Sequence, residues 1–199
     1  MRGAARKGGP YRDPVAHLGD EQEATKFARL AVDARRILAG EDRESSAHLG
    51  HALTNLGNRL SHRGSVKHAV EATTEAVQIF RRLAEEDPDA YSPDLALVVC
   101  NWSDDLFKAG REQEALAAIR EAVTLYRTMA EVNPAFQIDL AKSLLNLGAQ
   151  LAKQWQYQEA RAVTNESVTI LQSMPVVTSA PHRTLLAFAL ARLGLWQPA

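Results

Sequence analysis

The chain has 199 residues, of which 46% are hydrophobic and 24% charged, and its formal net charge at pH 7 is −1. This is the composition of an ordinary folded protein, and the near-neutral charge gives no general signal for nucleic acid or a membrane surface. The single cysteine excludes an intrachain disulfide and is typical of a reducing compartment, so the cytoplasm is the expected location.

Residues 1–18 are predicted to form a disordered basic tail. The segment MRGAARKGGPYRDP is rich in glycine and basic residues, and because no hydrophobic stretch follows it, it is not a secretory signal. No apolar run in the chain approaches the roughly 18 residues that a membrane span needs. A weak contact between the basic tail and an anionic partner is a minor alternative.

Beyond this tail the pattern is helical, and no segment is predicted as a strand. Residues 20–39 are expected to form the first helix. In the second, Leu49, Leu53, Leu56 and Leu60 recur at steps of three and four residues, which places them on one helix face. Gly64 then ends this helix, because glycine disfavours the helix interior.

Prolines mark the limits of the next helices. Asp87-Pro88 is expected to end a helix, because the residue before a proline disfavours the helical conformation. Ser92-Pro93 predicts a new start, with a capping hydroxyl and a proline in the first turn. The cycle then repeats, and the expected helices cover residues 20–39, 46–62, 66–86, 93–108, 112–132, 137–153, 157–173 and 182–196.

The same motif returns at an interval of 45 to 46 residues. The three copies are Asn55-Leu56-Gly57, Asn101-Trp102-Ser103 and Asn146-Leu147-Gly148. Self-similarity at such a period is typical of a stacked repeat array, in which each unit buries its apolar face against its neighbours.

Small residues follow these motifs at fixed offsets. Twelve residues after Gly57, Ser103 and Gly148 an alanine recurs, and another small residue follows seven residues later. We interpret them as the contacts at which two helices of a hairpin approach closely. The residues assigned to this repeat packing are Gly57, Ala69, Ala76, Ala115, Ala122, Gly148 and Ala160.

These offsets resemble those of the tetratricopeptide repeat (TPR). Pro88 and Pro134 come twelve residues after Ala76 and Ala122, so the second helix is about two turns longer than in the usual repeat. This resembles the long-repeat variety of kinesin light chains and the tandem arrays of actinobacterial proteins. The resemblance implies an all-α, right-handed α-solenoid of antiparallel helical hairpins, with about eight helices, over residues 19–196.

Aligned on this pattern, the array begins and ends with half units. We expect a half unit at 19–44, complete units at 45–90, 91–136 and 137–180, and a half unit at 181–196. Leu190, Leu193, Leu195 and Trp196 are apolar for a terminal helix. Either the chain is a piece of a longer array, or half units of different copies complete each other and form a homo-oligomer.

In tetratricopeptide arrays the first helix of each unit lines the concave groove. The resemblance places Asn55, Asn101 and Asn146 there, one unit apart. A primary amide has donors and an acceptor, so it can pair with the backbone of an extended peptide; tying neighbouring helices together or facing water are the alternatives. The resemblance assigns to the groove His51, Thr54, Asn55, Asn58, His62, Leu97, Cys100, Asn101, Asp104, Lys108, Lys142, Leu145, Asn146, Ala149, Lys153, Phe188, Ala191 and Arg192.

The carboxylate clamp of chaperone-binding tetratricopeptide domains is a sharper comparison. Asn58, Asn101 and Lys142 match three of its five positions, but Thr54 and Asn146 stand where the family has lysine and arginine. Because the charge-assisted partners are lost, we expect no true clamp. The C-terminal half of the groove is still basic and favours an acidic peptide or a peptide C-terminus, unless these charges only face water. The basic residues are Lys108, Lys142, Lys153 and Arg192.

Catalytic and metal chemistry find little support in the sequence. His48 and His51 supply two metal ligands at most, where a site needs three or four, and Cys100 has no recognisable base beside it. No phosphate loop, nucleophile elbow or dinucleotide motif is present. We therefore expect no enzyme, no metal and no cofactor.

The sequence thus predicts a protein–protein interaction module that binds an extended peptide in its concave groove. The alternative is a self-assembling module, or a sensor or scaffold segment of a larger signalling protein, that works through its open helical ends.

Overall fold

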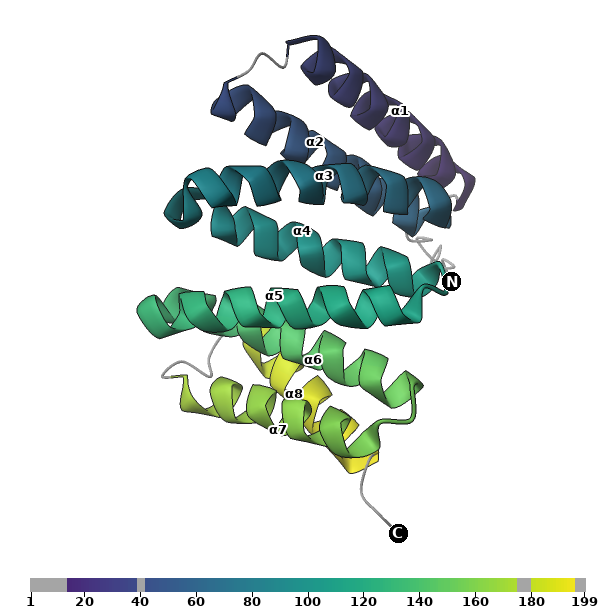
Figure 1. Cartoon of the computed structure of the whole chain (residues 1–199). Coiled ribbons are helices and arrows are strands. Elements are labelled where there is room, and N and C mark those ends of the chain that lie inside the picture. The colour runs from purple at the N-terminus through teal and green to yellow at the C-terminus, as the bar shows by residue number, and fades with distance from the viewer. Residues whose placement is uncertain (1–13, 39–41, 175–179, 196–199) are drawn as a thin grey trace, which may run out of the picture.

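The computed structural model describes residues 14–38, 42–174 and 180–195, and the described residues form eight α-helices and one 3-10 turn (Figure 1). Residues 1–13 of the predicted tail and Trp196 lie outside this part of the chain. The elements are α1 (Pro14–Leu38), α2 (Arg43–His62), α3 (Val66–Glu86), α4 (Pro88–Lys108), α5 (Glu112–Val132), η1 (Pro134–Phe136), α6 (Gln137–Lys153), α7 (Tyr157–Ser173) and α8 (Ala180–Leu195).

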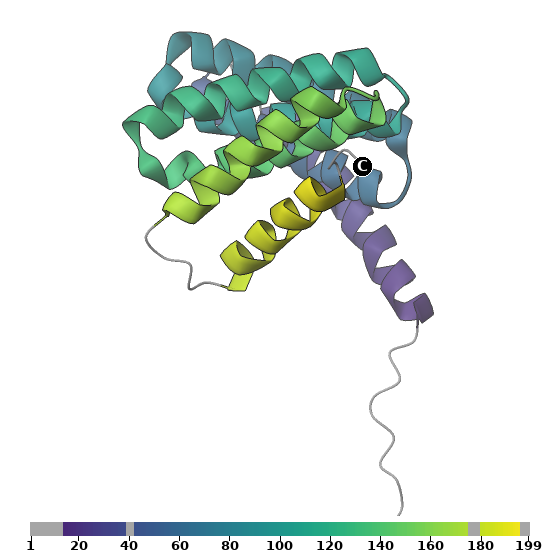
Figure 2. The ribbon, with the colours of Figure 1, turned by 90° about the horizontal axis from the view of Figure 1, so that it is seen from below.

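The helices pack in chain order, each against the next, and they alternate between two layers. The odd-numbered helices are joined by ion pairs, such as the one from Arg81 of α3 to Glu121 of α5. The even-numbered helices contact one another on the other side, where Gln150 of α6 bonds to Ser103 of α4. Helix α8 packs against α7, and Figure 2 shows it on the side of α7 that faces away from α5. The predicted all-α solenoid of helical hairpins is therefore confirmed.

Each hairpin is closed by small residues that let two helices approach closely. A Cβ added at Gly57 would lie 2.5 Å from Thr73 Cγ2, and one at Gly148 would lie 2.6 Å from Thr164 Oγ1. The alanines that follow are fully buried: Ala69, Ala76, Ala115, Ala122 and Ala160 each have 0% exposure. A Cβ at either glycine would require the facing threonine to shift. In the second hairpin this position is taken by the buried Ser103, which donates to the Ala115 carbonyl oxygen (2.9 Å).

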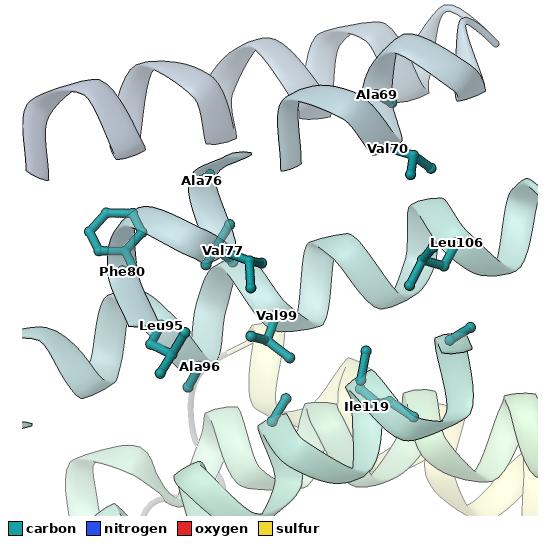
Figure 3. Packing of buried hydrophobic residues seen from close by; sticks show 14 of the residues in the cluster. Ala69, Val70, Ala76, Val77, Phe80, Leu95, Ala96, Val99, Leu106 and Ile119 are labelled. Atoms are coloured by element: carbon teal, nitrogen blue, oxygen red, sulfur yellow. The ribbon is translucent and has the colours of Figure 1, made fainter. Parts of the chain in front are cut away.

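Branched and aromatic side chains fill the space between the hairpins. Phe80 and Val77 of α3 and Val99 of α4 are almost completely buried. Figure 3 shows Val77, Val99 and Ile119 in the space between α3, α4 and α5. Burying a side chain of this size contributes roughly 1.5 to 3 kcal/mol, so this continuous core holds the layers in register.

Helix α4 begins five residues earlier than predicted. The carboxylate of Asp87 accepts a hydrogen bond from the Ala90 backbone N–H (3.2 Å), and Pro88 occupies the first turn. Asp87-Pro88 therefore starts the new helix as well as ending α3. Pro93, predicted as the start, lies inside α4. The predicted start of α4 is wrong because proline, which disfavours the interior of a helix, is favourable at its first position.

Helix α1 also begins earlier than predicted, at Pro14 rather than residue 20. The prediction of a disordered tail over residues 14–18 rests on the glycine-rich composition of the segment before them. These five residues contain no glycine, and the proline at the first position has the backbone angle that a helix requires. The predicted tail is thus at least five residues too long at its C-terminal side.

The turns inside the three hairpins have a left-handed residue at the same place. Gly64 and Gly110 have φ angles of 73° and 75°, and Trp155 takes this conformation in the third hairpin with a φ of 63°. Glycine adopts it freely, whereas a residue with a Cβ does so at a cost. Trp155 is therefore a strained position in an otherwise regular repeat.

Candidate binding surface

The candidate surface is the outer side of the even-numbered helices, which we call the even-helix face. The first helices of the three hairpins, α2, α4 and α6, place the repeated asparagines on it. Asn55 is exposed, and Asn101 and Asn146 are half-buried. Among the described residues, none donates to or accepts from these three side-chain amides. Their hydrogen-bonding groups are therefore available to another molecule.

The N-terminal end of this face is hollowed. A cavity of about 570 Å³ lies between α1 and α2, and Asn55, His48 and His51 are on its wall. His51 is fixed by its neighbours, because its ring lies 5.0 Å from that of Phe80 and its Nε2 lies 3.8 Å from Asp94 Oδ2. Thr54, predicted to line the groove, is buried instead and donates to the Gly50 carbonyl (2.8 Å).

In the middle of the face, α4 holds two partly buried acidic groups. Burial raises the pKa of Cys100 to about 12, and the carboxylates of Asp104 and Asp139 add to this. Burial also raises the pKa of Asp104, although Lys108 opposes the change. Cys100 therefore stays a neutral thiol at pH 7, which is the opposite of what a nucleophilic cysteine needs.

The predicted basic residues differ in how free they are. Lys108 Nζ donates to Ser61 Oγ at 2.6 Å, and Lys142 pairs with Asp139 at 2.9 Å within α6. Lys153 is exposed and makes no ion pair with another described residue. Two of the three lysines thus have an intramolecular partner that a ligand would have to share or displace.

Arg192 makes a structural contact that was not predicted from the sequence. Its Nη1 donates to the Leu145 carbonyl oxygen (2.9 Å), and its guanidinium lies 4.5 Å from the centre of the Phe188 ring. Burial lowers the pKa of Arg192. This side chain joins α8 to α6, and only its remaining donors are left for a ligand.

The opposite, odd-numbered layer carries a repeated set of ion pairs that sequence reasoning missed. Three arginine–glutamate pairs, which we call the Arg–Glu ladder, join α1 to α3, α3 to α5 and α5 to α7. The pairs are Arg36–Glu75, Arg81–Glu121 and Arg127–Glu166. Both partners recur at 45 to 46 residues, so the repeat period was a signal that could have found them. Each pair is partly exposed and contributes at most about 1 kcal/mol.

The described residues form neither a metal-binding cluster nor a membrane-spanning helix. Within residues 14–38, 42–174 and 180–195, no three His, Cys, Asp or Glu side chains gather as a metal site would require. None of the described helices is long and apolar enough to cross a membrane.

Comparisons with known proteins identify the fold. No protein-family model matches the chain, and no curated protein matches it. The structure is similar to BtubC (BKLC) from P. vanneervenii, with a TM-score of 0.67 and 18% identity over 88% of this chain. It is also similar to a protein of Podosopora anserina with nearly identical TPR-like repeats of the kinesin-light-chain kind, with a TM-score of 0.66 and 19% identity over 90% of this chain.

A third similar structure is the apo form of RapI, with a TM-score of 0.64 and 14% identity over 90% of this chain. The chain spans 65% of BtubC, 82% of the Podosopora protein and 49% of RapI. At these identities the likeness shows the fold, which is that of TPR-like repeat proteins, as the sequence resemblance predicted.

Proposed function

We propose that this protein binds an extended segment of another protein along the even-helix face. The observation that carries the proposal is the set of three amides, Asn55, Asn101 and Asn146, at the same position of successive hairpins and without an intramolecular hydrogen bond. A side-chain amide offers donors and an acceptor at once. Three of them in a row can pair with N–H and C=O groups along an extended backbone.

The charge of the face favours an acidic segment or a peptide C-terminus at its C-terminal half. Lys153 is unpaired among the described residues, and Lys108 and Lys142 make exposed contacts that water screens. A carboxylate offers such lysines a charge-assisted bond. We assign no nucleophilic role to Cys100, because burial raises its pKa and keeps it a neutral thiol. We place this interaction in the cytoplasm, as the single cysteine suggests.

The test is affinity capture from the lysate of the source organism with the wild type and with the triple variant Asn55→Ala, Asn101→Ala, Asn146→Ala. At about 1 kcal/mol for each hydrogen bond, the loss of three weakens binding on the order of a hundredfold. A partner retained by the wild type should therefore be absent from the triple variant. The matched control is Asn165→Ala, which removes an exposed asparagine from α7 on the odd-numbered layer.

The melting temperature of the triple variant should match that of the wild type, because these amides make no intramolecular bond. Equal capture by wild type and triple variant would contradict the proposal. The alternative function, self-assembly or a scaffold role in a larger protein, uses the faces of α1 and α8 at the two ends of the array.

A further inference from the structure

Helix α8 has the sequence pattern of a first helix, and among the described residues no second helix of its own packs on it. Leu190 occupies the repeat position of Leu53, Val99 and Leu144. These three side chains are no more than 1% exposed because the second helix of their own hairpin covers them, whereas Leu190 is 45% exposed. Leu190 is therefore an apolar side chain of the kind that is covered in the complete hairpins, but here no described residue covers it.

The backbone of α8 at Gly194 is uncovered in the same way. Gly194 takes the place of Gly57 and Gly148, where an added Cβ would meet a threonine of the facing helix at 2.5 and 2.6 Å. A Cβ added at Gly194 meets no atom within 4 Å. The space that a second helix fills in the complete hairpins is open beside α8.

Helix α1 is the converse: it has the pattern of a second helix, and no first helix of its own lies among the described residues. Ala31 takes the repeat position of Ala76 and Ala122, which are fully buried, but Ala31 is exposed. Phe27 takes the position of the buried Ala72 and is 64% exposed. Beside them lies the cavity between α1 and α2, which is lined by Ala24, Phe27, Ala28, Ala31 and Arg35 on the α1 side. This is where a first helix packs in every complete hairpin.

We propose that α8 of one copy of this chain packs beside α1 of a second copy, and that the two helices form a complete hairpin shared between chains. The repeat sets the register. Gly194 would lie against Ala24 and Ala28 of the second copy, as Gly57 lies against Ala69 and Thr73. Leu190 would lie against Ala31. The interface continues the packing that already joins the hairpins within one chain.

The neighbouring positions agree with this register. Phe188 of α8 takes the place of His51, which lies beside Asp94 of the next first helix. In the shared hairpin its neighbour would be His48 of the second copy, on the wall of the same cavity. Phe188 is 48% exposed in the single chain, and this contact would cover its ring.

The charges at the two ends do not oppose each other. The next rung of the Arg–Glu ladder would join residue 172 of α7 to residue 30 of α1. These residues are Gln172 and Leu30, so no like charges would meet at this rung. Arg35 of α1 takes the position of the buried Phe80 and lines the cavity, so its guanidinium would have to extend to solvent at the edge of the shared hairpin. Of the nine exposed large hydrophobic residues among the described ones, five are on α1 and α8: Phe27, Leu30, Ile37, Phe188 and Leu190. Exposed apolar surface is thus concentrated where the second copy would bind.

The two surfaces of this interface are different, so the contact is heterologous. Such contacts produce open chains of subunits unless the rotation closes a ring. The second copy would occupy the cavity between α1 and α2, on whose wall Asn55 lies, whereas Asn101 and Asn146 lie outside it. The two proposals are tested separately, because the end variants leave all three asparagines in place.

The first part of the test measures the mass of the full chain by light scattering after size-exclusion chromatography over a wide range of concentration. The wild type should form a series of species whose mass increases with concentration. Gly194→Leu should be monomeric, because its side chain fills the space that Ala24 and Ala28 would occupy. Ala31→Glu should be monomeric, because it places a carboxylate opposite Leu190.

Neither substitution should disturb the single chain, since Gly194 has free space around it and Ala31 is exposed. Circular dichroism and melting of dilute samples check this. The matched control is Ala117→Glu, an exposed alanine of α5 whose counterpart in α3 is Glu71. This control should assemble as the wild type does.

Mixing the two end variants is the decisive step. Gly194→Leu retains an intact α1 face, and Ala31→Glu retains an intact α8 face, so an equimolar mixture should form a heterodimer that grows no further. A wild type that is monomeric at all concentrations would overturn the proposal and assign the end faces to another occupant. Assembly that survives both substitutions, or a mixture that stays monomeric, would overturn it too.

Discussion

At the scale of single residues, Asp105 is a carboxylate that the fold buries. It is 2% exposed, and Thr73 Oγ1 donates to its Oδ2 at 3.2 Å. Burial raises its pKa, and the nearby Ser61, Lys108, Thr73 and His62 reduce this effect without cancelling it. The third hairpin has the neutral Gln150 at the same position. The negative charge of Asp105 is therefore unfavourable to folding at neutral pH.

We predict that Asp105→Asn stabilises the protein at pH 7 by on the order of 1 kcal/mol. A raised folded-state pKa means that the folded state binds the proton more tightly. The wild type then loses stability as the pH rises through the unfolded-state pKa, about 3.9, towards the folded-state pKa. The advantage of the asparagine variant should disappear below pH 4. Urea unfolding at pH 7 and at pH 3.5 measures this, and an equal difference at both pH values would contradict it.

At Trp155 the turn requires a backbone conformation that is unfavourable for a residue with a Cβ. Trp155 takes the left-handed conformation that Gly64 and Gly110 take in the other hairpins. Its side chain is 79% exposed, and the edge-on contact with the Tyr157 ring (6.0 Å between centroids) gives little in return. A left-handed residue with a Cβ costs about 1 to 2 kcal/mol.

Trp155→Gly should therefore raise the free energy of unfolding by roughly 0.5 to 1 kcal/mol, since glycine recovers the strain but loses more backbone entropy. Gly110→Ala is the converse change at the equivalent turn and should lower the free energy of unfolding by a similar amount. Denaturant titration of both variants tests this. A destabilised Trp155→Gly would show that the tryptophan side chain holds the turn more strongly than the strain opposes it.

At the scale of helices, the hairpin is the unit that the small residues define. In α6 and α7, Gly148 allows the helices to approach until a Cβ would lie 2.6 Å from Thr164 Oγ1 and 3.2 Å from the Ala160 carbonyl oxygen. The second of these atoms belongs to the backbone and cannot move away as a side chain can. The distance between the helices of this hairpin is thus fixed by the absence of a side chain.

Gly148→Val should separate α6 from α7 and cost about 1 to 3 kcal/mol, the usual range for overpacking, with a clear fall in melting temperature. Gly194→Val is the matched control. It makes the same change at the same repeat position, but no atom lies within 4 Å, so a dilute sample should melt as the wild type does. If both variants melt alike, close approach is not what sets the hairpin geometry.

At the scale of the whole molecule, the two layers differ in which polar side chains are available to another molecule. The even-numbered layer carries three amides without intramolecular partners, whereas the odd-numbered layer uses its charged residues on the Arg–Glu ladder. A repeat array contacts only its neighbours, so its two ends are the places where covered positions become exposed. The interaction along the face and the assembly at the ends follow from these two properties of the same array.

Several parts of this structure could be predicted from the sequence. The limits of α3, α5, α6 and α7 agree with prediction, because Gly64, Gly110 and the Asx-Pro pairs interrupt the apolar periodicity clearly. The hairpin fold followed from offsets between small residues. The predicted starts of α1, α2 and α4 were too late. Helices α1 and α4 begin at a proline, and α2 begins directly after the Asp42 cap. Only the cap formed by Asp87 shows that Asp87-Pro88 both ends α3 and starts α4.

The sequence by itself determined which faces of the helices are apolar and which residues repeat, since both depend only on spacing along the chain. Which side chains are free was decided by the tertiary structure. Arg192 bonds to the Leu145 carbonyl on another helix, Thr54 is turned inwards, and Asn146 is left without a partner. Availability depends on neighbours far away in sequence, so spacing alone does not reveal it. For the same reason only the packed structure shows that Gly194, alike in sequence to Gly148, faces open space.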